Sequence, residues 1–255
     1  GNDLTLSGVT ITGNSAVAGG GGAYSGDYGG RFSSLTIIDS EISNNTVLGG
    51  VGGGLSLYML GDVTITNTVV SGNTGSTNGG GVDFDDVGNV SIANSSFSGN
   101  STEYRGGGAR FYLAGNISIV NSSFADNEVR QGGGGGAYIR YVADISIDSS
   151  TFDQNVASLN DGGGLYASYS DSFTMTSSTV SGNEAVNGAG VVLRANGNVL
   201  FANTTIANNV GDLLYGAGGA VWMRGSTGST HIMFSTISGN VTRYDTVRLV
   251  SDSPN

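Results

Sequence analysis

The sequence predicts an all-β protein, a right-handed parallel β-helix of about nine coils, with 26–31 residues and three short strands in each coil. An asparagine recurs at intervals of 26–31 residues along the whole chain. Each asparagine lies ten residues after the start of a motif that has apolar or β-branched residues at offsets zero, two and seven. A glycine-rich segment follows most of the asparagines. The nine asparagines are Asn14, Asn45, Asn73, Asn100, Asn127, Asn155, Asn183, Asn209 and Asn240.

The fourth coil shows the order of the predicted elements. Residues 90–93 alternate between apolar and small polar side chains, which is typical of a half-buried strand. Asn94 and Ser95 break this alternation and predict a turn. Residues 96–98 form the second predicted strand, with Phe97 pointing inward, and Gly99 and Asn100 end it. Inward side chains that stack from coil to coil each contribute about 1.5–3 kcal/mol of burial, so a core is available without a second layer.

The third predicted strand, residues 109–112, follows a glycine triplet at 106–108. We expect Ala109 and Phe111 to point inward, and Arg110 and Tyr112 to point outward. The glycines are expected to supply positive φ angles and close packing at a corner. They do not predict a phosphate loop, because neither a GK[ST] sequence nor a helical pattern follows them.

The asparagine column is interpreted as an internal corner support. A side-chain amide at a sharp corner can satisfy unpaired backbone groups and can bond to the identical amides of the coils above and below. We expect the loss of one such amide to cost about 1–3 kcal/mol.

Composition excludes several classes of partner. The formal net charge is −11, Lys is absent and all nine basic residues are Arg, which argues against nucleic-acid binding and anionic membranes. No apolar run approaches the roughly 20 residues of a membrane span, so this segment is not expected to insert into a membrane. The chain has no Cys, and neither a metal nor a cofactor is predicted. Residues 1–255 are expected to form a single β-helix domain, a mature chain or a piece of a longer surface protein.

Two short motifs carry a resemblance to a known family. FxxN occurs at 97–100, 124–127 and 152–155, and GGA or GGL occurs at 21–23, 53–55, 135–137 and 163–165. Their alternation resembles the repeats of chlamydial polymorphic outer-membrane proteins and of other large bacterial surface proteins. This resemblance implies a right-handed β-helix at the cell surface, with an adhesive role and an extracellular location. It implies no catalytic residue.

The outward side of the third strands is the candidate binding surface. Arg and Tyr in a shallow strip suit the carboxylates or sulfates of an acidic glycan, and a host or cell-surface protein is the other expected partner. Pairing between neighbouring coils would explain the same residues without a ligand. The candidate residues are Asp83, Asp85, Asp86, Arg110, Tyr112, Tyr138, Arg140, Tyr141, Tyr166 and Arg194.

Three further hypotheses remain open from the sequence. A polysaccharide lyase or hydrolase would also be a β-helix, and its candidate groups would be the Asp83–Asp86 cluster, or Arg110 or Arg140 with Tyr138. A Ser/Thr column on the outward side of the first strand raises ice binding as a lesser alternative. Finally, unpaired strands at the ends of the stack predict end-to-end self-association.

Overall fold

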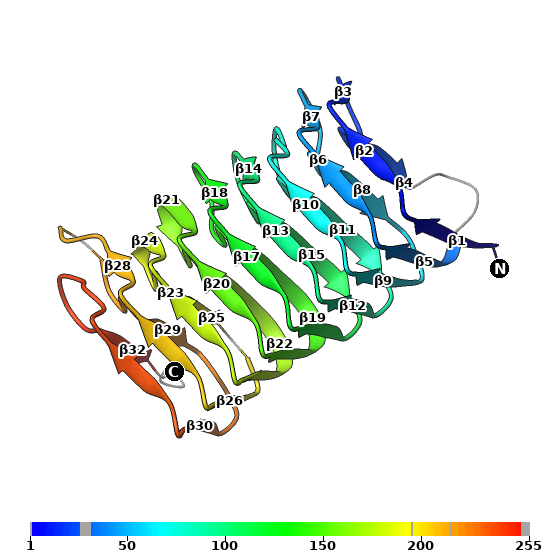
Figure 1. Ribbon diagram of the computed structural model, residues 1–255. Coiled ribbons are helices and arrows are strands. Elements are labelled where there is room, and N and C mark those ends of the chain that lie inside the picture. The colour runs from blue at the N-terminus through cyan, green and yellow to red at the C-terminus, as the bar shows by residue number, and fades with distance from the viewer. Residues whose placement is uncertain (1, 26–31, 195, 215, 251–255) are drawn as a thin grey trace.

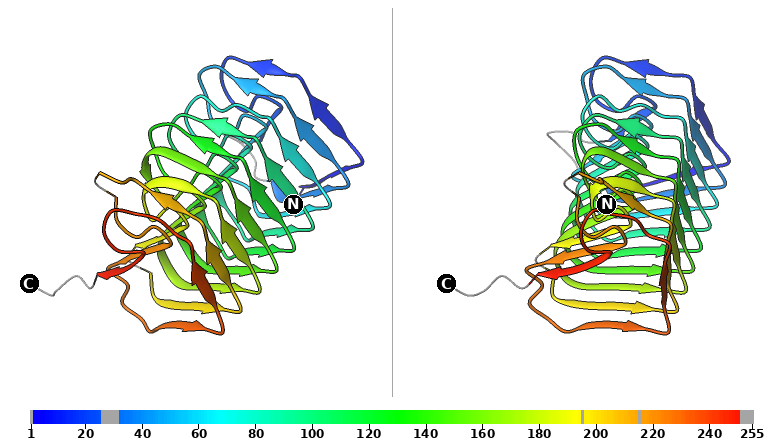
Figure 2. Two further views of the ribbon diagram at one scale, coloured as in Figure 1. Left: turned by 60° about the vertical axis from the view of Figure 1, so that its left-hand side comes forward. Right: turned by 90° about the vertical axis from the view of Figure 1, so that its left-hand side faces the viewer.

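The computed structural model describes residues 2–25, 32–194, 196–214 and 216–250, and it confirms the right-handed parallel β-helix. Every strand pair in the described residues is parallel, and none of these residues forms a helix. The coils stack in sequence order along one axis, as Figures 1 and 2 show. At about 4.8 Å per rung, nine coils give a rod roughly 40 Å long.

The first and third strands of the coils belong to one 16-stranded sheet that bends between them. β19 (Ala137–Asp148) and β22 (Leu165–Thr176) run through the bend, so each serves as the third strand of one coil and the first strand of the next. The other first strands are β1 (Asn2–Ser7), β5 (Phe32–Ile38), β9 (Asp62–Thr66), β12 (Val90–Ala93), β16 (Ile117–Val120), β26 (Asn198–Ala202) and β30 (Thr230–Met233). The other third strands are β4 (Ala23–Ser25), β8 (Leu55–Tyr58), β11 (Val82–Val87), β15 (Ala109–Ala114), β25 (Val191–Arg194), β29 (Val221–Arg224) and β32 (Val247–Val250).

The second strands form a separate nine-stranded sheet with one strand from each coil. They are β2 (Thr10–Thr12), β6 (Glu41–Ser43), β10 (Val69–Ser71), β13 (Ser96–Ser98), β17 (Ser123–Ala125), β20 (Thr151–Asp153), β23 (Thr179–Ser181), β27 (Thr205–Ala207) and β31 (Thr236–Ser238).

A fourth short strand follows the asparagine in most coils, which the sequence did not predict. These strands form a two-stranded and a five-stranded sheet. The first consists of β3 (Ser15–Ala16) and β7 (Thr46–Val47). The second consists of β14 (Ser101–Thr102), β18 (Glu128–Val129), β21 (Val156–Asp161), β24 (Glu184–Asn187) and β28 (Val210–Gly211).

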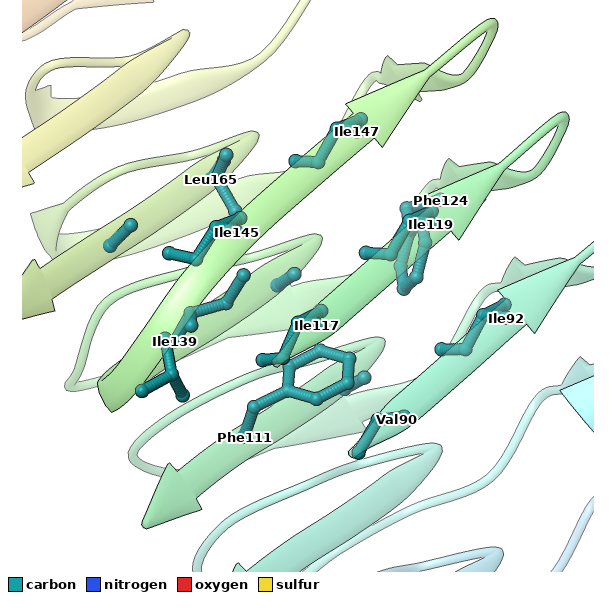
Figure 3. Close-up of a cluster of buried hydrophobic side chains, with 14 of the residues drawn as sticks. Val90, Ile92, Phe111, Ile117, Ile119, Phe124, Ile139, Ile145, Ile147 and Leu165 are labelled. Carbon is teal, nitrogen blue, oxygen red and sulfur yellow. The ribbon is translucent and has the colours of Figure 1, made fainter. Parts of the chain in front are cut away.

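The core is a set of in-register columns of apolar side chains, several of which Figure 3 shows. Ile92 pairs with Ile65 and Ile119 on the first strands, and all three are fully buried. On the second strands, the rings of Phe97 and Phe124 stack with their centres 4.6 Å apart. Offsets zero, two and seven are therefore core positions, as the sequence predicted.

Each coil turns its corners with residues in the left-handed conformation. In the fourth coil these are Asn94 at φ 51°, Gly99 at φ 61°, Gly106 at φ 67° and Leu113 at φ 53°. Asparagine and glycine tolerate this conformation best, which explains their recurrence at the corners.

The nine asparagines form the predicted ladder. Asn127 donates through Nδ2 to Phe97 O at 3.0 Å and to Asn155 Oδ1 at 2.9 Å, and its own Oδ1 accepts from the backbone N–H and Nδ2 of Asn100, each at 3.0 Å. The seven asparagines from Asn45 to Asn209 are fully buried. The amides therefore satisfy backbone groups and one another, and they are not available to a ligand.

A second ladder of hydroxyl groups lies at offset five, next to the left-handed corner. Ser95 Oγ donates to Ala93 O at 2.8 Å and accepts the backbone N–H of Thr68 at 3.1 Å. The same position holds Ser40, Thr68, Ser95, Ser122, Ser150, Ser178, Thr204 and Ser235. At the preceding position, Asn94 and Asn121 are exposed and form a single hydrogen bond of 2.7 Å.

Candidate functional site

The outward residues of the third strands stack in the predicted register. Arg110 pairs with Asp83 and Tyr138, and Arg140 pairs with Tyr112 and Ser168. Two outward columns result, one that runs through Asp83, Arg110, Tyr138 and Tyr166, and one that runs through Asp85, Tyr112, Arg140 and Arg194. Asp86 and Tyr141 lie one residue beyond these columns, with left-handed φ angles of 54° and 58°, at the bend toward the next coil.

The expectation of a shallow, solvent-exposed strip is wrong for the first column. Asp83 is 2% exposed, Arg110 8% and Tyr138 5%. In the segment between the asparagine corner and the third strand, a glycine with positive φ lies against this column. A Cβ on Gly79 (φ 58°) would lie 2.7 Å from Asp83 Cβ, and one on Gly162 (φ 72°) would lie 2.9 Å from Tyr166 Cβ. These glycines therefore provide both the positive φ and the close approach.

Asp83, Arg110 and Asp85 form a mostly buried charge cluster. Arg110 Nη1 donates to Asp83 Oδ1 at 2.7 Å, and Nη2 donates to Asp85 Oδ2 at 3.0 Å. Burial raises the pKa of the Asp83 carboxyl above its ordinary value, and the Arg110 guanidinium opposes that rise. In this part of the predicted strip, the charged side chains therefore pair between neighbouring coils.

A pocket of about 230 Å³ opens beside the cluster, between β19, β22 and β25 on one side and the segments that cover these strands on the other. Tyr138, Arg140, Tyr166 and Arg194 come from the strands. The loops contribute Tyr104, Arg105, Gln131, Gly132 and Gly133, and the end of β21 contributes Asn160 and Asp161. Four of the ten candidate residues are thus brought together, and Asp83, Asp85, Asp86, Arg110, Tyr112 and Tyr141 do not line this pocket.

The charges in the pocket are unbalanced. Arg194 Nη2 lies 2.5 Å from Asp161 Oδ2, and Asp161 also accepts from Asn187 Nδ2 at 2.8 Å. Arg140 Nη2 donates to the phenol of Tyr141 at 2.8 Å. Neither Arg140 nor Arg105 forms an ion pair with an acid of the described residues. The lining therefore carries three guanidinium groups and one carboxylate, in a chain whose net charge is −11.

The aromatic faces of the site are largely occupied by neighbouring coils. The rings of Tyr138 and Tyr166 stack with centres 4.8 Å apart and planes within 7°. The guanidinium carbon of Arg140 lies 4.6 Å from the ring centre of Tyr141 and 5.2 Å from that of Tyr169. The pocket therefore offers guanidinium, amide and phenol groups for hydrogen bonds rather than free ring faces for sugar stacking.

Arg105 and Asp161 were missed by the sequence analysis. Both come directly before a glycine-rich segment, at 106–108 and 162–164. The available signal was a charged residue directly before the glycines, which occurs in only some coils. Spacing did not reveal these residues, because the segments before the glycines vary in length and show no repeat.

The acidic residues do not favour the hydrolase alternative. Asp83 and Asp85 share Arg110, so they do not resemble two carboxyl groups on either side of a glycosidic bond. Arg110 is buried and does not line the pocket, whereas Arg140 and Tyr138, the other pair of candidate groups, both line it. No group of three or more His, Asp or Glu side chains in the described part of the chain is placed to hold a metal ion.

Comparison with protein-family models, with curated proteins and with solved structures finds no match for the chain. Within the described residues, no helix has the length and apolar character needed to cross a membrane.

Proposed function

We propose that the protein is a rigid extracellular rod of the bacterial surface that displays a binding site for acidic glycans on the outer side of its third strands. The observation that carries this proposal is the pocket that gathers Arg105, Arg140 and Arg194 around a single carboxylate. Unpaired guanidinium groups in an otherwise acidic protein attract an anion locally, and their planar donor groups match carboxylate and sulfate oxygens. The FxxN and GGA repeats support the location and the adhesive role.

The fold suits display because its stiffness does not depend on the pocket. The buried asparagine ladder joins all nine coils, and none of its asparagines lines the pocket. Substitutions in the pocket are therefore expected to change binding without unfolding the rod.

A glycan array with acidic and neutral members tests the proposal. The parent should retain acidic glycans, and a variant with Arg105→Gln and Arg140→Gln should lose most of that signal. Arg130→Gln is the control, because Arg130 is exposed and does not line the pocket. Far-UV circular dichroism verifies that all three proteins fold. Binding that is equal in the parent and the double variant, or a preference for neutral glycans, would refute the proposal.

A further inference from the structure

The size of the pocket limits what can enter it. Its volume of about 230 Å³ is below the roughly 300–1,000 Å³ of pockets that enclose drug-sized ligands. The loops that carry Tyr104 and Gln131, together with Asn160 near the end of β21, form its outer wall. A polymer that runs along the rod cannot lie inside such a pocket, whereas one compact residue can.

The donors of the pocket identify the chemical group that it would hold. Arg140 and Arg105 present guanidinium groups that no carboxylate of the described residues neutralises. The Nε–H groups of Arg140 and Arg194 are buried and have no acceptor. A carboxylate supplies two coplanar acceptor oxygens that fit one guanidinium, so it matches this donor set better than a neutral hydroxyl.

The neighbouring side chains favour hydrogen bonds over stacking in the rest of the pocket. Tyr138 and Tyr166 cover one another, and the guanidinium carbon of Arg194 lies 5.7 Å from the ring centre of Tyr166 and 4.5 Å from Trp222. Burial raises the pKa of the Tyr166 phenol, with the charge of Arg194 opposing the rise, so this phenol stays protonated at neutral pH. Asn160 is exposed at the rim, where its amide can reach the hydroxyl groups of a sugar.

We infer that the pocket binds the terminal, carboxylate-bearing residue of an acidic glycan, so that the protein recognises chain ends rather than chain interiors. This inference rests on the proposed function and adds the unit that is recognised. The Arg140 and Arg105 guanidinium groups hold the carboxylate, and the wall formed by the loops excludes a continuing chain on one side.

Isothermal titration calorimetry with three probes tests the inference. The probes are a trisaccharide of a uronic acid, the methyl ester of the same trisaccharide, and a long polymer of the same uronic acid. When ligand concentrations are expressed per chain end, the affinities of the trisaccharide and the polymer should agree within about threefold. The methyl ester and the Arg140→Gln variant should each bind at least about tenfold more weakly, as expected for the loss of a charged hydrogen bond. Arg130→Gln should bind like the parent.

Two results would overturn the inference in different ways. In the first, polymer binding would depend on the concentration of sugar residues, and its affinity per chain end would be much higher than that of the trisaccharide. This result would mean that chain interiors are recognised. That result would leave the proposed acidic-glycan function intact. Absence of binding to all three probes by the folded parent would overturn the inference for uronic acids, and the array described above would then show whether the proposed function fails with it.

Discussion

Replacement of Asn127 by alanine is the most direct perturbation of the ladder that joins the coils. Asn127 is fully buried, and its side chain makes four hydrogen bonds, to Phe97 O, to Asn155 Oδ1 and from two donors of Asn100. Alanine would leave the backbone N–H of Asn100 and one Nδ2 hydrogen of Asn100 without an acceptor. Each orphaned buried donor costs about 1–3 kcal/mol, so the free energy of unfolding should fall by about 2–6 kcal/mol. This range is higher than the one expected from the sequence, because the structure shows how many partners a single amide serves.

Guanidinium denaturation followed by far-UV circular dichroism measures this loss. Asn94→Gly is the matched control, because Asn94 is an exposed corner amide with φ 51° and its side chain accepts one hydrogen bond, from Asn121. Glycine tolerates this φ, so the control should change stability by less than about 1 kcal/mol. A repeat protein can unfold in parts, so the slope of the transition must be compared as well as its midpoint. An Asn127→Ala transition that overlays the parent would refute the ladder as a stabilising element.

Three other predictions concern the corner, the charge cluster and the ends of the rod. Gly108→Ala should destabilise more than Gly8→Ala, because a Cβ would lie 2.5 Å from Gly136 O at the first position, whereas at the second it meets nothing within 4 Å and only the positive φ of 63° disfavours alanine; equal melting temperatures would contradict this. The raised pKa of Asp83 means that the folded state binds its proton more tightly, so the denaturation midpoint of the parent minus that of Asp83→Asn should rise as pH falls from 7 toward 4; a difference that stays constant or falls would contradict this. Leu6 and Ile232, core residues of the two end coils, are partly exposed, so sedimentation velocity should detect concentration-dependent association; a constant sedimentation coefficient would exclude it.

The fold was predictable because the parts that define it repeat. The columns through Ile92 and Phe97 and the ladder through Asn127 occupy fixed offsets, and stacked coils must place equal offsets together. The hydroxyl ladder through Ser95 was equally regular in the sequence. It was overlooked because Ser and Thr are common throughout this chain, so a regular column of hydroxyl groups does not stand out.

The site was only partly predictable because it depends on the segments that do not repeat. The period of two correctly placed Arg110 and Tyr138 on the outward side of the third strands. It could not show that the loops fold over them, because burial there depends on loop length and on contacts at Gly79 and Gly162. Asp161, the partner of Arg194, lies at the end of β21, in the part of the coil that varies in length, so spacing alone could not place it beside Arg194.

A crystal structure of the protein with a uronic-acid trisaccharide would test the central claim most directly. The claim is that the pocket lined by Arg105, Arg140 and Arg194 holds the carboxylate of a terminal sugar. We predict density for one sugar residue inside the pocket, with its carboxylate within hydrogen-bond distance of the Arg140 guanidinium and the rest of the chain directed to solvent. A trisaccharide bound elsewhere on the rod, with the pocket containing only water, would contradict the claim.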